Sequence, residues 1–113
     1  MIAKPHQRYD LAVNGNACIP ALKALSDETR LRILRVLSRS AVSVGEISEQ
    51  LEVSPYNVSK HLRILRDAGL LVCEKRGKQR LYSIPEKLRD ELRASGGVLN
   101  LGCCTFRFDR LPK

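Results

Sequence analysis

Two adjacent cysteines near the carboxyl end, Cys103 and Cys104 in "LNLGCCTFRF", are the residues of this sequence best suited to chemistry. The chain has four cysteines, so half of its thiols stand in one dipeptide. Adjacent cysteines can offer two sulfurs on the same side of the backbone, and thiolates bind soft, thiophilic ions. The pair therefore predicts a thiol site, whose role depends on the elements that position it.

Few other metal ligands accompany the pair. Structural zinc centres use four nitrogen or sulfur ligands, commonly at CxxC or HxxxH spacing, and the two histidines, His6 and His61, are far from the pair in sequence. No carboxylate cluster adjoins the thiols, which disfavours cations that prefer oxygen. Cys18 and Cys73 are interpreted as packing residues. A soft ligand suits the pair best, and the alternative is that the two cysteines are incidental residues of a tail.

The composition places the pair in a small basic protein. A chain of 113 residues suits one domain. Twenty Lys and Arg against twelve Asp and Glu give a net charge of +8, which predicts a polyanionic partner unless the charge is spread evenly over a solvated surface. The first residues lack the apolar run of a signal peptide, and no segment reaches the roughly 20 apolar residues of a membrane helix. We therefore expect no membrane partner and a cytoplasmic protein with reduced thiols.

The chain divides into an arm, a helical domain and a tail. Residues 1–17 are weakly patterned and end in the turn signal "NGNA". The domain, residues 18–94, opens with a helix in which Ile19, Leu22 and Leu25 share a face, and Asp27 is placed to cap a second helix, "ETRLRILRVLSRS". Its last helix, "PEKLRDELRA", ends at "SGG", and residues 95–113 form a tail that carries the cysteine pair.

A helix-turn-helix lies at the centre of this domain. Ser43 and Glu46 form a capping box around the start of one helix, while Ser54 and Pro55 open a second one, "SPYNVSKHLRILRDAG", which ends at Gly69. Two helices joined by a few residues are typical of this motif. Next, "LLVCEKRGKQRLYSI" predicts strand, turn and strand, a wing. The predicted fold is mainly α with a β-hairpin wing (α+β), a winged helix-turn-helix.

The positive charge gathers on the second of these helices and on the wing. Residues 54–80 hold seven Lys and Arg against Asp67 and Glu74, so seven minus two leaves +5 of the chain's +8. The first turns of such a recognition helix usually meet base edges, and the polar residues there are Tyr56, Asn57, Ser59, Lys60 and His61. Phosphates would be held mainly by Lys60, Arg63, Arg76, Lys78 and Arg80. The alternative is a helical domain whose polar face happens to be basic.

Three segments, "LKALSDETRLRILRVL", "VSKHLRILRDAGLL" and "KRGKQRLYSI", resemble the winged helix-turn-helix repressors of the ArsR/SmtB family over roughly residues 20–93. The resemblance implies a homodimer joined by its first and last helices. It implies a repressor, not an enzyme, that binds double-stranded operator DNA at an inverted repeat and is released by an inducer. The positions that match the family's DNA-reading residues are Ser54, Pro55, Asn57, Ser59 and His61, and Tyr56 is an unusual occupant of its position.

The residues of the family's other inducer sites are missing here. The first helix of the helix-turn-helix, "EISEQLE", has no cysteine for an arsenic, cadmium or lead site, and "EKLRDELRAS" has no histidine for a zinc site. In contrast, "GCC" resembles the carboxyl-terminal vicinal pair of the family's arsenic and antimony sensors. The resemblance therefore implies that Cys103 and Cys104 bind trivalent antimony or arsenic as the inducer.

The third ligand of such an inducer is open. Arsenic sensors of this kind often have a further cysteine downstream, whereas "TFRFDRLPK", residues 105–113, contains none. Cys18 of either chain, a small cellular thiol, water or hydroxide could complete the site, or no third ligand is needed. We favour a two-cysteine site completed by a non-protein ligand. A site without a third protein thiol tolerates a larger ion, which slightly favours antimony over arsenic.

Two other functions are open at this stage. A DNA-binding repressor of the same fold could use the pair as a redox switch, with oxidation as its signal. A thiol oxidoreductase belongs to another class, but the chain lacks a CxxC in a βαβ context, and an enzyme leaves the basic helix and wing unexplained.

Overall fold

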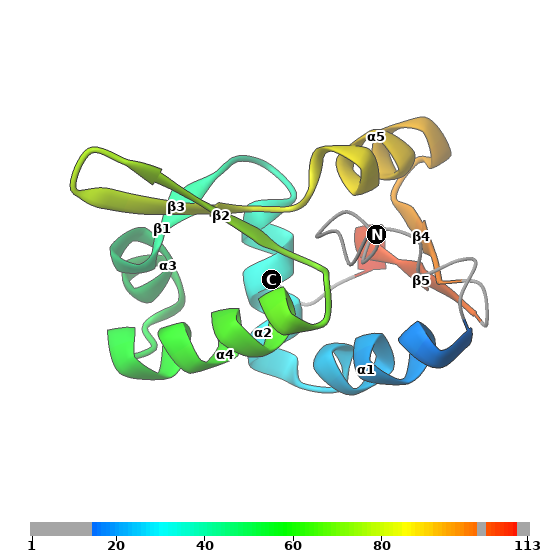
Figure 1. Cartoon of the computed structure of the whole chain (residues 1–113), viewed down its shortest axis with the longest axis horizontal. Helices are drawn as coiled ribbons and strands as arrows, with labels where there is room; N and C mark the ends of the chain where they lie inside the picture. The colour runs from blue at the N-terminus through cyan, green and yellow to red at the C-terminus, as the bar shows by residue number, and fades with distance from the viewer. Residues whose placement is uncertain (1–14, 102–103, 111–113) are drawn as a thin grey trace, which may run out of the picture.

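The structure, a computed structural model, describes residues 15–101 and 104–110 (Figure 1). Its helices are α1 (Gly15–Leu25), α2 (Glu28–Leu37), α3 (Val44–Leu51), α4 (Pro55–Asp67) and α5 (Glu86–Ser95). Its strands are β1 (Val42–Ser43), β2 (Val72–Arg76), β3 (Gln79–Ser83), β4 (Val98–Asn100) and β5 (Thr105–Arg107), and a short 3-10 helix, η2 (Phe108–Arg110), follows. Within the described ranges, no helix is long and apolar enough to cross a membrane.

The elements gather at two ends of the molecule. Figure 1 shows α3, the start of α4 and the tip of the β2–β3 hairpin at one end, and α1, α5 and the β4–β5 hairpin toward the other. The predicted winged helix-turn-helix is confirmed, since α3 and α4 are followed by the β2–β3 wing. The first end therefore carries the residues predicted to meet DNA, and the second carries the segment of the cysteine pair.

The caps of the helix-turn-helix form as predicted. Ser43 and Glu46 make the capping box: Ser43 Oγ accepts from the Glu46 N–H at 3.3 Å, and the Glu46 carboxylate accepts from the Ser43 N–H at 3.0 Å. Ser54 Oγ accepts from the Asn57 N–H at 3.2 Å at the start of α4. Gly69, just past α4, takes the left-handed conformation with φ 83°. These local contacts set where both helices begin and where α4 ends.

The turn between α3 and α4 is held by a side chain that the sequence pattern did not single out. Glu52, the last cap of α3, adopts left-handed backbone angles of φ 57° and ψ 43° without being glycine. Two hydrogen bonds between Ser48 and Val53 stabilise the backbone around Glu52. Ser48 Oγ donates to the carbonyl oxygen of Val53 at 2.6 Å, and the Val53 N–H donates to the Ser48 carbonyl at 3.3 Å. This double link fixes the direction in which α4 leaves the turn.

The cap of α2 gives a stability prediction. Asp27 Oδ1 accepts from the Arg30 N–H at 3.1 Å. Burial of the Asp27 carboxyl opposes its ionisation, but the Arg30 N–H and the Arg30 charge, followed by His61 and the Thr29 N–H, hold the pKa of Asp27 below its ordinary 3.8. We expect Asp27→Ala to lower the free energy of unfolding by about 1 kcal/mol at neutral pH, and Asp27→Asn, which still caps, to lower it less.

The acid dependence of this effect follows from the direction of the pKa shift. Because the folded-state pKa of Asp27 is depressed, its contribution is fully present above pH 3.8 and is lost as the pH falls through the folded-state value. Urea unfolding at neutral pH and in acid measures it. A difference between wild type and Asp27→Ala that stays constant into strong acid would contradict the ionised cap.

The buried residues of α4 are those predicted, whereas α1 buries a different set from the one predicted. Val58, Leu62 and Leu65 are buried, each at most 1% exposed. On α1 only Leu25 of the predicted face is buried, while Ile19 and Leu22 are 56% and 38% exposed. The helix starts earlier than the pattern suggested and presents a different set of residues to the core: Cys18, Ala21, Ala24 and Leu25. The exposed pair leaves an apolar patch on α1.

The wing is a regular antiparallel hairpin with an extra strand. The sheet order is β1–β3–β2, and β2 and β3 pair from Val72 with Ser83 to Arg76 with Gln79. The two-residue loop places Gly77 at φ 60°, and a Cβ there would meet nothing within 4 Å. A positive φ at the first loop position suits a type II′ turn, which matches the twist of the strands. The wing tip is thus short and fixed in register.

The segment after α5, predicted as a tail, contains a folded hairpin. β4 and β5 pair with Leu99 opposite Phe106, and Leu99, Leu101 and Phe108 are buried in the common core. The rings of Phe106 and Phe108 meet edge to face, with centroids 5.9 Å apart and an interplanar angle of 85°. These apolar residues alternate with polar ones, which supports strands that bury one face. The cysteine pair therefore lies between two anchored strands.

Candidate nucleic-acid interface and thiol site

A basic groove runs between α4 and the wing. Its volume is about 490 Å³, and it is lined from α4 by Tyr56, Ser59, Lys60, Arg63 and Arg66 and from β3 by Arg80 and Tyr82. Residues 56, 59, 60, 63 and 66 share one side of a helix with 3.6 residues per turn. That side lies away from the stripe of Val58, Leu62 and Leu65, which faces the core. The groove thus presents cations on both walls to solvent.

The predicted base-reading residues lie mostly at the exposed start of α4. Ser54, Pro55, Asn57 and Ser59 are all exposed, and the Asn57 N–H donates to the cap at Ser54. Tyr56 is 73% exposed, and Lys60 places its ammonium 5.4 Å from the centre of the Tyr56 ring. A cation at this distance is attracted by the ring face. Tyr56 and Lys60 therefore act as one amphipathic unit at the groove entrance.

His61 has different surroundings from the other predicted DNA-reading residues. It is half-buried on the flank of α4 that faces α2, and its Nδ1 lies 3.1 Å from a guanidinium nitrogen of Arg30. The groove between α4 and the wing is not lined by His61. Its ring thus contacts a neighbouring helix while the remaining reading residues face solvent.

Arg66 and Tyr82 line the groove but were not among the site residues predicted from the sequence. Burial of the phenol and the hydrogen bond with the Cys73 thiol raise the pKa of Tyr82, against the nearby charges of Arg66 and Arg80. The phenol therefore stays protonated and able to donate at neutral pH. Helical spacing from Ser59 and Arg63 could have indicated Arg66, whereas Tyr82 depends on how the wing packs on α4.

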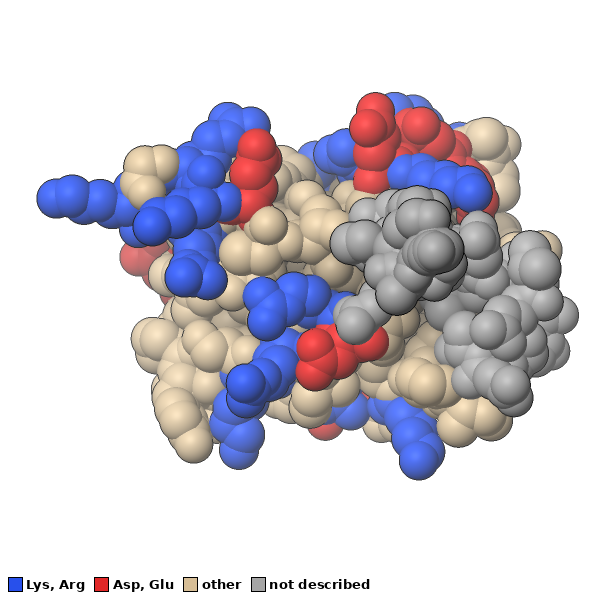
Figure 2. Space-filling view, in the orientation of Figure 1, with Lys and Arg blue, Asp and Glu red and all other residues tan. Residues whose placement is uncertain are grey.

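The charge distribution agrees with a nucleic-acid surface. Figure 2 shows Lys and Arg over the wing and along α4, whereas acidic and basic atoms are mixed over α5. The wing contributes Lys75, Arg76, Lys78 and Arg80, all of them exposed. Arg76 makes a 3.3 Å ion pair with Glu74, and both side chains are 66% exposed. Such an exposed pair is weak, so Arg76 can exchange it for a phosphate.

Two single substitutions distinguish base recognition from phosphate binding. We expect Lys78→Ala, at the wing tip, to weaken binding to all DNA sequences by a few-fold, because phosphate contacts are sequence-independent. Asn57→Ala should weaken binding and also remove about 1–3 kcal/mol of discrimination at one base pair. Fluorescence anisotropy with a duplex selected by the wild-type protein from a random pool, and with single-base variants of that duplex, measures both effects.

The matched control is Lys87→Ala, which removes an exposed lysine from α5, away from the wing. It should leave both affinity and discrimination unchanged. Equal discrimination by wild type and Asn57→Ala across all single-base variants would contradict base reading by Asn57.

The structure describes three of the four cysteines, each in a different environment. Cys104 is exposed and reduced, just before β5, and Cys103 lies outside the described residues. Cys18 is buried in α1 at 1% exposure, and its sulfur is disulfide-bonded. Cys73 is a reduced, half-buried thiol opposite Tyr82 in the wing, and not the fully buried packing residue predicted. Within the described ranges, no three His, Cys, Asp or Glu side chains gather in a way that could hold a metal ion.

Hydrogen bonds connect the β4–β5 hairpin and Cys104 to one another and to the end of α5. The Leu101 N–H donates to the Cys104 carbonyl at 2.9 Å, and the Phe108 N–H donates to the Gly97 carbonyl at 2.7 Å. Ser95 Oγ accepts from the Val98 N–H at 3.0 Å and donates to the Val98 carbonyl at 2.8 Å. These hydrogen bonds connect Cys104 to the end of β4, and the β4–β5 hairpin to the end of α5.

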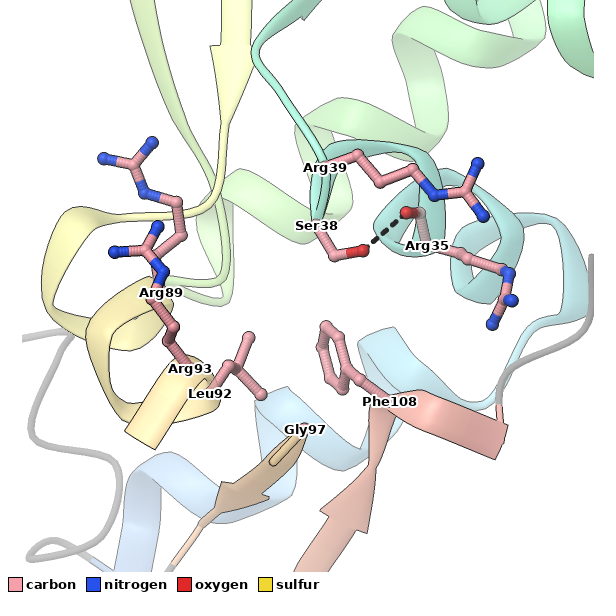
Figure 3. A pocket seen from close by; sticks show the side chains of 8 residues that line it. All are labelled: Arg35, Ser38, Arg39, Arg89, Leu92, Arg93, Gly97 and Phe108. Atoms are coloured by element: carbon pink, nitrogen blue, oxygen red, sulfur yellow. Dashed lines mark hydrogen bonds between the residues drawn. The ribbon is translucent and has the colours of Figure 1, made fainter. Parts of the chain in front are cut away.

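A second hollow of about 300 Å³ adjoins this hairpin (Figure 3). Leu92 of α5, Gly97 and Phe108 lie along one part of it, and Ser38 stands at the end of α2, where its Oγ donates to the Arg35 carbonyl at 2.6 Å. Figure 3 shows the side chains of Arg89 and Arg93 extending to one side and those of Arg35 and Arg39 to the other. The hollow thus separates α2 from α5, with the hairpin between them.

A capped helix-turn-helix with a basic wing defines a DNA-binding transcriptional regulator. A helix-turn-helix domain family matches residues 25–74. The transcriptional activator HlyU of Vibrio cholerae is 35% identical over 80 residues, which are 71% of this chain and 74% of the relative. The arsenical resistance operon repressor of Bacillus subtilis is 37% identical over 86 residues, 75% of this chain and 77% of the relative.

Solved structures agree with this class. The structure of HlyU from Vibrio cholerae superposes with a TM-score of 0.62 at 32% identity, covering 74% of this chain and 91% of that chain. The fold is also similar to the homodimeric winged helix-turn-helix domain of Mb0332 from Mycobacterium bovis, described as a possible ArsR-family regulator, with a TM-score of 0.66 at 23% identity over 85% of this chain and 86% of that one. The chain belongs to the ArsR family of winged helix-turn-helix transcriptional regulators.

Proposed function

We propose that this protein is a homodimeric repressor that leaves its operator when trivalent antimony or arsenic binds Cys103 and Cys104. The observation that carries the proposal is the position of Cys104. Cys104 is an exposed, reduced thiol directly before β5, and the β4–β5 hairpin is hydrogen-bonded to the residues that end α5, at the end of the molecule opposite the tip of the wing. An inducer bound there acts on the fold without touching DNA. Such a DNA-binding regulator works in the cytoplasm.

The dimer is supported by the apolar surface of α1. Ile19 and Leu22 are exposed in the isolated protomer, and Mb0332, which shares the fold, is homodimeric. Burying this patch against a second copy would remove apolar surface from water at both subunits. A two-fold dimer places two α4 helices about one turn of DNA apart, so its operator is an inverted repeat.

The choice of inducer rests on the chemistry of the thiols. Trivalent antimony and arsenic are soft and bond to thiolates, which Cys103 and Cys104 supply side by side. The chain from 105 to 113 contains no further cysteine, so we assign the third position to a non-protein ligand. Antimony, the larger ion, is the preferred inducer, with arsenic close behind. The arsenical resistance repressor of Bacillus subtilis is a relative of this chain, which supports the metalloid class.

Release requires the inducer to favour one of two conformations. Binding at the turn alters the β4–β5 hairpin, and the hydrogen bonds from Phe108 to Gly97 and from Val98 to Ser95 pass this change to α5. If α5 joins the subunits, the distance between the recognition helices changes with it. The inducer must bind the DNA-free arrangement more tightly, typically by about 1–3 kcal/mol, for the operator to be released.

A titration of the protein–DNA complex tests the proposal. The selected duplex is bound under reducing conditions, and antimonite or arsenite is added while anisotropy is followed. We expect release at about one metalloid per cysteine pair, with antimonite acting at lower concentration, and native mass spectrometry should give the same ratio. Zinc, cadmium and lead should not release the duplex. An unchanged complex at saturating antimonite and arsenite would overturn the proposal.

A thiol redox switch is the second candidate, and the disulfide at Cys18 favours it. Cys18 is disulfide-bonded, so oxidation of a thiol is compatible with this fold. Peroxide in the absence of metalloid distinguishes the two candidates. Release by peroxide that dithiothreitol reverses, without release by antimonite, would assign the switch to oxidation.

A further inference from the structure

Arg30 joins three helices through a single side chain. Its Nε donates to the carbonyl oxygen of Ala24 at 2.6 Å, and one Nη donates to the carbonyl of Lys23 at 3.3 Å. Its other Nη lies 3.1 Å from Nδ1 of His61 in α4. Arg30 itself stands in the first turn of α2, where its N–H is held by Asp27. The guanidinium thus links the end of α1, the start of α2 and the recognition helix.

The contacts with α1 are those expected at a helix end. The last carbonyls of a helix have no partner within the helix, and they attract cations because the helix dipole is negative there. The Lys23 carbonyl also accepts from Ser26 Oγ at 2.7 Å. Ala24 and Leu25 beside it are buried. The guanidinium is therefore held in a fixed position against a packed helix end.

The third contact determines the protonation of His61. A guanidinium is always charged and only donates hydrogen bonds. Nδ1 of His61 must then be the acceptor, so the imidazole is neutral and carries its proton on Nε2.

The position of His61 in α4 suits the Nε2–H tautomer to a contact with DNA. His61 flanks the buried stripe of Val58, Leu62 and Leu65 on the side next to Asn57, one turn away. Since Nε2 lies across the ring from Nδ1, its N–H is directed away from Arg30. A donor at that point complements phosphate oxygens and the acceptor atoms of base edges.

We propose that Arg30 is a positioning residue for DNA recognition. It fixes His61 as the neutral Nε2–H tautomer, which donates to DNA, and it holds α4 in place against the end of α1. The assignment does not depend on the identity of the inducer. It makes α1, which contains the disulfide-bonded Cys18, part of the support of the recognition helix.

Two substitutions of His61 test the roles of its two ring nitrogens separately. In His61→Asn the amide oxygen takes the place of Nδ1, so the acceptor for Arg30 is kept and the outer donor is lost. In His61→Gln the amide NH₂ reaches the place of Nε2, so the donor is kept and the acceptor is lost. Combined with Arg30→Gln, they form double-mutant cycles on affinity for the selected duplex.

We expect Arg30→Gln to lower affinity for the selected duplex roughly tenfold in the wild-type background, and to have almost no further effect in the His61→Gln background. Arg30→Lys, which keeps the positive charge and a donor group but not the planar fork, should cause a smaller loss than Arg30→Gln. Arg32→Gln is the matched control, because Arg32 lies toward α3 beside Gln50 and Leu51; it should change nothing. An equal loss from Arg30→Gln in the wild-type and His61→Gln backgrounds would overturn the proposal.

A spectroscopic readout works even if an Arg30 variant folds poorly. In a His6→Gln protein, His61 is the remaining imidazole, and its ¹⁵N shifts and long-range proton couplings report the tautomer directly. We expect Nε2–H with an unprotonated Nδ1 at neutral pH, in the DNA-free protein and in the complex. Arg30→Gln should introduce the Nδ1–H tautomer or the imidazolium. An Nδ1–H tautomer or an imidazolium in the protein with Arg30 intact would refute the assignment.

Discussion

Replacing both members of the vicinal pair, Cys103→Ser with Cys104→Ser, should leave operator binding intact and abolish release by antimonite and arsenite. Neither cysteine belongs to α4 or the wing, which line the basic groove, so the double replacement should remove no DNA contact. Serine is close to cysteine in size but does not form the soft metalloid–sulfur bond. The factor by which the inducer weakens DNA binding, typically about 5–150-fold for coupled sites, should fall to one.

Single variants assign the ligands. Cys73→Ser is the matched control, since Cys73 is the reduced thiol of the wing and the metalloid response should survive its loss. Cys18→Ser tests the third ligand: an unchanged response fits a site completed by a non-protein ligand, and a weakened one assigns Cys18. Stoichiometry by native mass spectrometry accompanies each titration. Full release of the double serine variant by antimonite would place the inducer elsewhere.

Affinity for DNA should fall steeply with salt. Each protomer offers seven cations from α4 and the wing, namely Lys60, Arg63, Arg66, Lys75, Arg76, Lys78 and Arg80. A protein that contacts about six to ten phosphates loses about 10³–10⁵ in affinity between 50 and 200 mM salt, because bound counterions are released from the DNA. We expect a dimer of this chain to lie in that range, as measured by anisotropy over a salt series.

The slope of the salt series locates the contacts. In a plot of the logarithm of DNA affinity against the logarithm of salt concentration, the slope for Lys78→Ala should be smaller in magnitude by roughly two, because each dimer loses two phosphate contacts. Lys87→Ala on α5 should leave the slope unchanged. A flat salt dependence of the wild-type protein would contradict the assignment of the groove between α4 and the wing.

Local chemistry explains why the helix-turn-helix could be predicted. The caps at Ser43, Glu46 and Ser54 and the glycine at Gly69 act within four residues of their partners, so their effect can be found in a short stretch of sequence. The wing followed from a change to alternating residues around a two-residue turn. The sign and place of the charge followed from counting Lys and Arg between residues 54 and 80.

The errors arose where a pattern fits more than one partner. On α1, Ile19 and Leu22 have core spacing, yet the helix turns them to solvent and buries Cys18 and Ala21. Helical spacing shows which residues share a face but not what that face meets. Similarly, the glycines at the end of α5 indicated the end of a helix correctly, but nothing local showed that the chain returns as a hairpin onto the core.

The sequence by itself determined the DNA-binding module, its charge and the vicinal thiols, because capping, periodicity and charge are properties of neighbouring residues. Only the tertiary structure decided the contacts between distant segments: Tyr82 beside Arg66, the β4–β5 hairpin tied to α5, and Arg30 against His61, 31 positions apart. Such contacts depend on how helices pack, since a side chain such as Arg30 bonds whichever acceptors the fold brings within its reach. The function of a residue like His61 is therefore set by its neighbours in space more than by its place in a motif.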